Sequence, residues 1–293
     1  MTQSNKIQLP VGTLRLACLA MAFAACGGGP VMSGVAVGKV GRGLSVHAHA
    51  VPPGSEVCSF REAIVAPTAG ERPVSLSEAC QKTVKSGLLW RHTLVVLAAY
   101  AERLEAIASG TAPETAGQLE AALIGPAPPE SDNPSEQAAR NAAAQLVSQM
   151  ATVGPKGDLD KAVKDAAPQV SILCTGLAAY FEAQAKSLGD TQRDIDRKRT
   201  TKSDRRCGGL DNRTVCVSES VIDRLVYASV SSHIATLDNR YGEARDATAT
   251  FCAAHRKLEE GAAAGPLSKD KYYTEILDAV KAARRAEKPA DKK

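Results

Sequence analysis

The residues of this chain with the widest chemical range are its cysteines, eight in all. Six of them fall in the body of the chain, and they are Cys58, Cys80, Cys174, Cys207, Cys216 and Cys252. None has the C-x-x-C spacing of zinc ribbons and dithiol redox sites. An even set without metal-binding spacing predicts disulfide bonds, provided that the chain reaches an oxidising compartment.

Cys207 and Cys216 form the pair that the sequence predicts most directly. The stretch between them holds two glycines followed by Asp211-Asn212, residues that favour a bend of the backbone. Such a bend brings the two Cα atoms within the ~7 Å that a disulfide requires. We therefore predict a Cys207–Cys216 bond.

The other four cysteines leave their pairing open. Cys80 lies near the start of a predicted helix and Cys252 near the end of another. If those two helices are antiparallel, both cysteines fall at the same end. We therefore expect Cys80–Cys252 with Cys58–Cys174, and the main alternative is Cys58–Cys80 with Cys174–Cys252.

Three short motifs bear on nucleophilic catalysis. Ser268-x-x-Lys271, Ser131-Asp-Asn133 and Lys85-Ser86-Gly87 resemble the motifs of penicillin-binding proteins and serine β-lactamases. Their order along the chain is the reverse of that family's order, and Lys85 lies in a helical pattern where the family has a strand. We therefore predict no serine acyl-transfer site.

The histidines suggest structural roles. His47 and His49 have the spacing of two ligands on an extended strand, but isolated pairs of this kind are common and bind metals weakly. His233 and His255 lie on or beside a long helical apolar stripe, where a buried, hydrogen-bonded histidine is the expected reading. The sequence therefore predicts no catalytic residue, no metal ligand and no cofactor.

The first 26 residues have the pattern of an export signal. Lys6 and Arg15 precede a short apolar run over residues 16–25, which is too short to span a bilayer. Ala24-Ala25 then precedes Cys26, and this resembles the lipobox of bacterial lipoproteins, with Phe23 where that family most often has leucine. The resemblance implies cleavage after residue 25, diacylglycerol on the Cys26 sulfur and an acyl chain such as palmitate on the new amine.

The same resemblance implies a location. Lipoproteins of this kind are retained at the inner membrane mainly by aspartate after the lipidated cysteine, and Gly27 stands there instead. We therefore expect a cell-envelope protein on the outer membrane, facing the periplasm, with lipid on Cys26 as its only membrane attachment.

The rest of the chain divides by composition and periodicity. Residues 26–54 are rich in glycine and proline and predict a flexible tether. Residues 55–265 predict a helical domain, because apolar residues recur at three-to-four spacing over 76–108, 133–153, 158–188 and 218–258. Residues 266–293 predict a last helix and a basic tail. The expected fold is all-α, an antiparallel bundle of four to six helices without a β-hairpin.

One polar segment has a distinct charge. Residues 193–206 hold seven basic and three acidic residues, and we expect an inter-helix loop there. Arg197, Lys198 and Arg199 are the candidate anion-binding residues, with an anionic envelope polymer or an envelope protein as partner. The plainer interpretation is a solvated loop without a partner.

Net charge and aromatic content argue against one class of function, nucleic-acid binding. Removing Lys6 and Arg15 leaves 34 basic against 32 acidic residues, so the mature chain is nearly neutral, and only 4% of residues are aromatic. Neither property suits nucleic-acid binding. We expect a non-enzymatic, membrane-anchored helical module that binds or spaces another envelope component. The alternatives are an envelope enzyme with a scattered active site and a helical carrier with an apolar cavity.

Overall fold

The computed structural model describes residues 29–50, 58, 77–110, 130–152, 158–201, 205–210, 213–264 and 276. Helices make up nearly all of this part, which confirms the all-α fold class. They are α2 (Gly29–Ala50), α4 (Glu78–Ser109), α6 (Pro134–Thr152), α7 (Leu159–Thr201) and α8 (Glu219–Ala263). No helix among these residues is long and apolar enough to cross a membrane.

The helix starts follow from local capping. Ser77 caps α4 by accepting a hydrogen bond from the backbone N–H of Cys80 at 3.2 Å, and Asn133 Oδ1 accepts one from Ser135 N at 3.0 Å ahead of α6. Asp158 Oδ1 does the same for the first turn of α7. At the other end of α4, Gly110 has a φ of 67°, the left-handed conformation in which glycine has no steric cost.

The two longest helices carry the apolar stripes that the sequence predicts. Every described member of the α8 stripe is buried: Val230, Ile234, Leu237, Tyr241, Ala244, Thr248, Phe251, His255 and Leu258. On α7, Val163, Ala167, Val170, Leu173, Leu177, Phe181 and Leu188 are buried as well. Pro168 is a residue that would be expected to kink or split such a helix; it does not split this one, because α7 runs through it as one helix.

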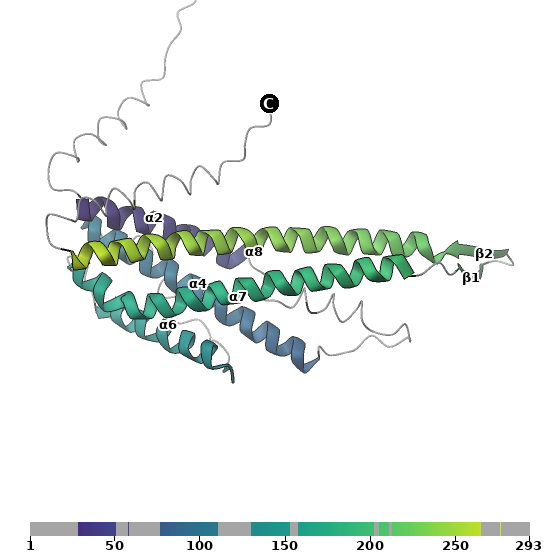
Figure 1. Cartoon of the computed structure of the whole chain (residues 1–293), viewed down its shortest axis with the longest axis horizontal. Coiled ribbons are helices and arrows are strands. Elements are labelled where there is room, and N and C mark those ends of the chain that lie inside the picture. The colour runs from purple at the N-terminus through teal and green to yellow at the C-terminus, as the bar shows by residue number, and fades with distance from the viewer. Residues whose placement is uncertain are drawn as a thin grey trace, which may run out of the picture.

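Helices α7 and α8 pair antiparallel and run on past the ends of α2, α4 and α6 (Figure 1). Cys174 meets Cys252 in the bundle, and Gln192 Nε2 donates to Ser231 Oγ at 3.1 Å further along the pair. We call the part of α7 and α8 beyond the other helices the stalk. A two-stranded hairpin closes its far end (Figure 1).

The disulfides are Cys58–Cys80 and Cys174–Cys252, so the favoured pairing is wrong and the alternative is found. The reason is helix direction. Helices α4 and α8 run parallel, because α2 is antiparallel to α4, α7 begins beside the start of α2, and α8 is antiparallel to α7. Cys80 and Cys252 therefore lie toward opposite ends of the bundle.

The flexible tether predicted over residues 26–54 is wrong for residues 29–50, which form helix α2. Its glycines allow a close approach to α4. A Cβ at Gly34 would lie 2.5 Å from Ala108 Cβ, and a Cβ at Gly41 would lie 1.9 Å from Ala101 Cβ. The glycines at 34, 38 and 41 are four and three residues apart, so they share one helix face. They are therefore packing residues rather than signs of flexibility.

We expect Gly41→Ala to destabilise the protein by roughly 2–3 kcal/mol, because the added methyl has no room against α4. Gly43→Ala is the matched control, since nothing lies within 4 Å of a Cβ built there. In the same helix, that change should raise stability by about 0.5–1 kcal/mol. Thermal and urea unfolding of both variants measure this, and equal effects would contradict close packing at Gly41.

Candidate functional site

The three candidate anion-binding residues lie at the end of α7, which forms one side of the stalk. The expected loop over 193–206 is wrong, because α7 continues to Thr201 and a strand begins at Arg205. Arg193 pairs with Asp190, and Arg197 lies 3.8 Å from Asp194. The two arginine side chains are 72% and 77% exposed, so these pairs contribute little stability. The arginines therefore carry their charge at the protein surface.

The end of the stalk is the hairpin of β1 (Arg205–Leu210) and β2 (Arg213–Ser218), which overturns the expectation of no β-hairpin. The strands are antiparallel, and Leu210 pairs with Arg213 around a two-residue connection at 211–212. A two-residue connection containing aspartate or asparagine is typical of hairpins. The sequence does hold one signal for this hairpin, namely two six-residue segments of equal length on either side of 211–212. Gly208 and Gly209 hide that signal, because glycine weakens the strand pattern in β1.

The register places Cys207 directly opposite Cys216. Counting from the hydrogen-bonded pair next to the turn, this is a non-hydrogen-bonded pair, whose Cα atoms are typically ~4.5 Å apart. That separation falls within the range of disulfides. The backbone arrangement is therefore compatible with the predicted bond.

The Cys207–Cys216 bond remains a prediction. Non-reducing peptide mapping of the exported protein should find the two peptides linked, and closing this short loop should stabilise the fold by about 2–3 kcal/mol. Free thiols at both positions, or bonds from them to other cysteines, would refute it.

A buried polar pair lies inside the bundle. Tyr100 on α4 and His255 on α8 are both buried, and Tyr100 Oη lies 2.9 Å from His255 Nε2. Burial lowers the pKa of His255 to about 4, and burial together with the charge of Glu259 raises the pKa of Tyr100. His255 is thus neutral at physiological pH, in keeping with the expected structural role.

No metal site is found among the residues that the structure describes, since no three of their His, Cys, Asp and Glu side chains converge. His47 and His49 lie on α2, a helix rather than the strand that their spacing would need. His49 Nδ1 lies 2.7 Å from the backbone oxygen of Ser45. Its ring is therefore engaged within its own helix.

A small cavity lies between α4, α6 and α7, with a volume of about 60 Å³. Its lining is mostly apolar, and Arg103 and Asp165 are the charged residues in it. Small-molecule sites usually measure ~300–1,000 Å³, so this cavity has room for a few waters rather than a substrate.

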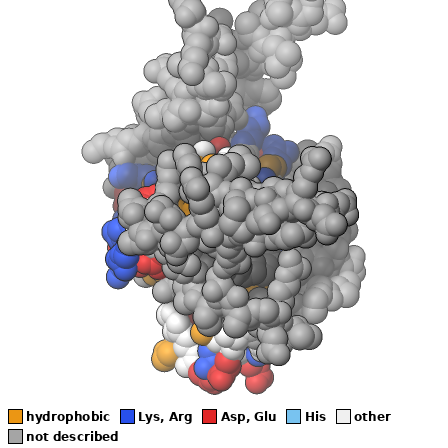
Figure 2. All heavy atoms as spheres, turned by 90° about the vertical axis from the view of Figure 1, so that its right-hand side faces the viewer, with side chains coloured by type: hydrophobic (Ala, Val, Ile, Leu, Met, Phe, Trp, Pro, Cys, Tyr) orange, Lys and Arg blue, Asp and Glu red, His pale blue; other side chains and the backbone are white. Residues whose placement is uncertain are grey.

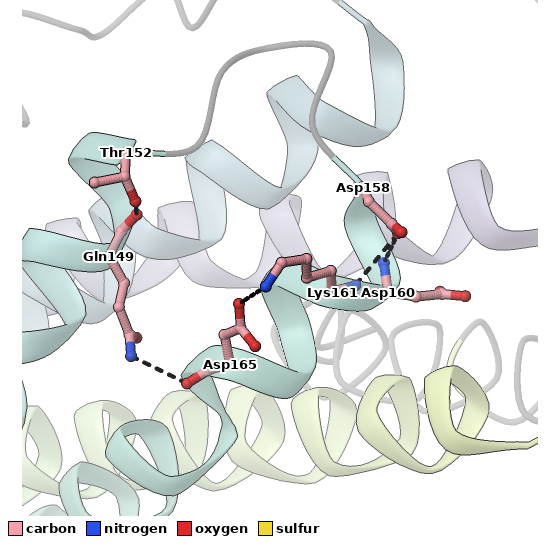
Figure 3. A network of polar contacts seen from close by, with 6 residues as sticks. All are labelled: Gln149, Thr152, Asp158, Asp160, Lys161 and Asp165. Carbon is pink, nitrogen blue, oxygen red and sulfur yellow. Dashed lines mark hydrogen bonds and ion pairs between the residues drawn. The ribbon is translucent and has the colours of Figure 1, made fainter.

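A polar network beside this cavity fixes the α6–α7 corner (Figure 3). Gln149 Nε2 donates to the backbone oxygen of Asp165 at 3.1 Å, and Lys161 Nζ lies 2.7 Å from the Asp165 carboxylate. Thr152 Oγ1 donates to the backbone oxygen of Gln149 at 2.8 Å. Gln149 ties the end of α6 to the second turn of α7, and the other two bonds lie within their own helices, so the network has a structural role.

Cys26 and residues 266–275 and 277–293 lie outside the described residues, so the lipidation site and the basic tail have no structural account here. Figure 2 looks at the molecule from its hairpin end, and the described Lys, Arg, Asp and Glu side chains visible there are intermixed. No protein-family model, no curated protein and no solved structure matches the chain.

Proposed function

We propose that this protein is a cell-envelope lipoprotein, anchored by lipid on Cys26, whose helical body is a non-enzymatic module that binds or spaces another envelope component. The observation that carries this proposal is the position of the start of α2 relative to the hairpin. The two lie at opposite ends of an elongated molecule (Figure 1).

Contacts along α2 define the end that would be anchored. Gly34 lies against Ala108, near the end of α4, and against Leu159, the first residue of α7. Cys26 precedes Gly29 by three residues, a span of at most ~11 Å. A lipid on Cys26 would hold this end of the bundle close to the membrane.

The length of α7 sets the distance to the other end. With 43 residues, α7 is about 65 Å long, and the hairpin follows its last turn. An anchored chain can therefore carry the hairpin and the basic end of α7 far from its lipid. This arrangement suits a module that reaches a partner, such as an anionic envelope polymer or an envelope protein.

Two other observations favour this proposal. Cys58–Cys80 and Cys174–Cys252 lie at bonding distance, which suits a protein outside the reducing cytosol and supports export. The cavity between α4, α6 and α7 is too small to hold a carried ligand, and His255, the most deeply buried histidine described, pairs with a tyrosine rather than a carboxylate. Gly27 after the cysteine favours the periplasmic face of the outer membrane.

The test is removal of the Cys26 thiol. Cys26→Ala should abolish acyl labelling and leave the protein unprocessed or release it from the membrane, since acyl chains are needed for stable retention. Cys18→Ala is the matched control, because Cys18 lies within the signal segment and should not be acylated. Fractionation and intact mass measure both. Unchanged membrane partition and mature mass in Cys26→Ala would end the proposal.

A further inference from the structure

We infer that the Cys174–Cys252 disulfide is a site of thiol–disulfide exchange, which a dithiol protein of the envelope reduces while the chain stays folded. The bond joins α7 to α8, and both of its cysteines are partly exposed. The other disulfide that the structure describes, Cys58–Cys80, is different, because Cys80 is fully buried. The two bonds therefore differ in their access to an attacking thiol.

The neighbours of Cys174 and Cys252 place this bond at the edge of the contact between α7 and α8. Leu177 and His255, three residues after each cysteine, are buried. The residues three before and four after each cysteine lie on the same helix face as that cysteine, and all four are exposed. They are Ser171, Ala178, Ala249 and Arg256. Three of these side chains are small, so they put little bulk in the path of a reductant.

The leaving sulfur also distinguishes the two bonds. Exchange requires that the sulfur that is not attacked departs as a thiolate. Burial in apolar surroundings disfavours a thiolate, because it raises the pKa of the thiol. Attack on Cys58 would release the thiolate on Cys80, which has no exposed surface. Attack on Cys174 or Cys252 releases it on a partly exposed residue, so this bond should be reduced first.

Arg256 favours the reaction at this bond. It lies one helical turn after Cys252 and is exposed, so its positive charge attracts the incoming thiolate. The same charge stabilises the thiolate that leaves, as cations near reactive cysteines do. The residues within four positions of Cys174 include no acidic residue that would oppose this effect.

The reaction balances with a dithiol as the reductant. One of its thiolates attacks a sulfur of the bond, and the electron pair of the broken S–S bond goes to the other cysteine, which takes up a proton. The second thiolate of the reductant then attacks the mixed disulfide and releases the first cysteine in the same way. The chain gains two electrons and two protons, and the dithiol becomes a disulfide.

Packing holds the two helices together after reduction. Leu173 and Leu177 flank Cys174 in the core, and Phe251 precedes Cys252 there. These contacts do not involve the sulfurs. Reduction therefore removes a covalent link between the two helices of the stalk without unfolding the bundle.

This inference goes beyond the proposed function and depends on it only because the bonds must form after export. The exported protein is incubated in native buffer with reduced thioredoxin or with dithiothreitol, quenched with iodoacetamide and mapped by mass spectrometry. We expect Cys174 and Cys252 to be alkylated at least about tenfold faster than Cys58 and Cys80 with both reductants. The far-UV circular dichroism signal should not change.

Two arginine variants test the charge beside the bond. Arg256→Gln should slow reduction of Cys174–Cys252 about twofold, which is the size of an interaction between residues one turn apart. Arg245→Gln is the matched control, because Arg245 is also exposed on α8 but lies two turns from Cys252 and pairs with Asp246. It should leave the rate unchanged, and equal effects of the two variants would refute the role of Arg256.

The other contrary results are equally clear. Reduction of Cys58–Cys80 first, or of both bonds at one rate, would overturn the inference, and so would loss of helical signal in step with reduction. Reduction by dithiothreitol but not by thioredoxin would exclude a protein reductant. A reversed order in protein acylated on Cys26 ends this inference alone, whereas the expected order without acylation ends the proposed function alone.

Discussion

Replacing Cys174 and Cys252 together by alanine is expected to lower the free energy of unfolding by about 4 kcal/mol. The bond joins residues 78 apart in sequence, so it removes a large amount of conformational freedom from the unfolded chain. The closed loop contains the whole stalk and the hairpin. Urea unfolding monitored by far-UV circular dichroism gives the free energy, and the m value should rise because the unfolded chain becomes more extended.

Removal of Cys58–Cys80 provides the comparison. Its residues are 22 apart, so loss of that bond should cost about 3 kcal/mol by the same reasoning. The long-loop variant should therefore be the less stable of the two. Equal stability of wild type and the Cys174–Cys252 variant would show that this bond does not form in the exported protein.

Lowering the pH from 6.5 to about 4 is expected to destabilise the protein by about 3 kcal/mol through His255 alone. Burial lowers the pKa of this histidine to about 4 in the folded chain, whereas the unfolded chain has the ordinary value of 6.5. Between these values the unfolded state takes up a proton that the folded state does not. The free energy of unfolding therefore falls by 1.36 kcal/mol for each pH unit, and the contribution levels off below pH 4.

His255→Gln isolates this effect, because glutamine can still bond to Tyr100 Oη but does not titrate. Other groups titrate in the same range, including His92, whose pKa is also lowered by burial. They are common to both proteins, so the difference between the two pH profiles belongs to His255. Parallel profiles from pH 6.5 to 4 would show that the folded chain binds this proton as readily as the unfolded chain does.

The sequence predicts the helices that a single apolar stripe defines, and it fails where a second element decides the structure. The α8 stripe from Val230 to Leu258 is buried as expected, because period and composition agree there. Helix α2 is different. In the sequence, Gly34 and Gly41 indicate flexibility, but in the structure they allow α2 to pack closely against small residues of α4. The intrinsic helix propensity of a segment does not depend on the helix that packs against it, so it could not predict this contact.

The predictions of the disulfide pairing and of a fold without a hairpin are wrong for related reasons. Cys80 and Cys252 could be paired only by assuming a direction for α4 relative to α8, and neither helix specifies the direction of the other. For the candidate site, charge identified the segment around Arg197 but not its structure. The hairpin has a register in which Arg206 lies opposite Val217, and composition cannot reveal a register.

The stalk has a mechanical consequence. From Cys174, where a disulfide fixes α7 to α8, to the last residue of α7 is a distance of about 40 Å. A rotation of about 5° at that bond would displace the hairpin by about 3–4 Å over such an arm. Small changes in packing within the bundle, such as repacking of Trp90 on Gly176, are therefore enlarged at the far end. Conversely, a force on the hairpin acts on the bundle with the leverage of the whole arm.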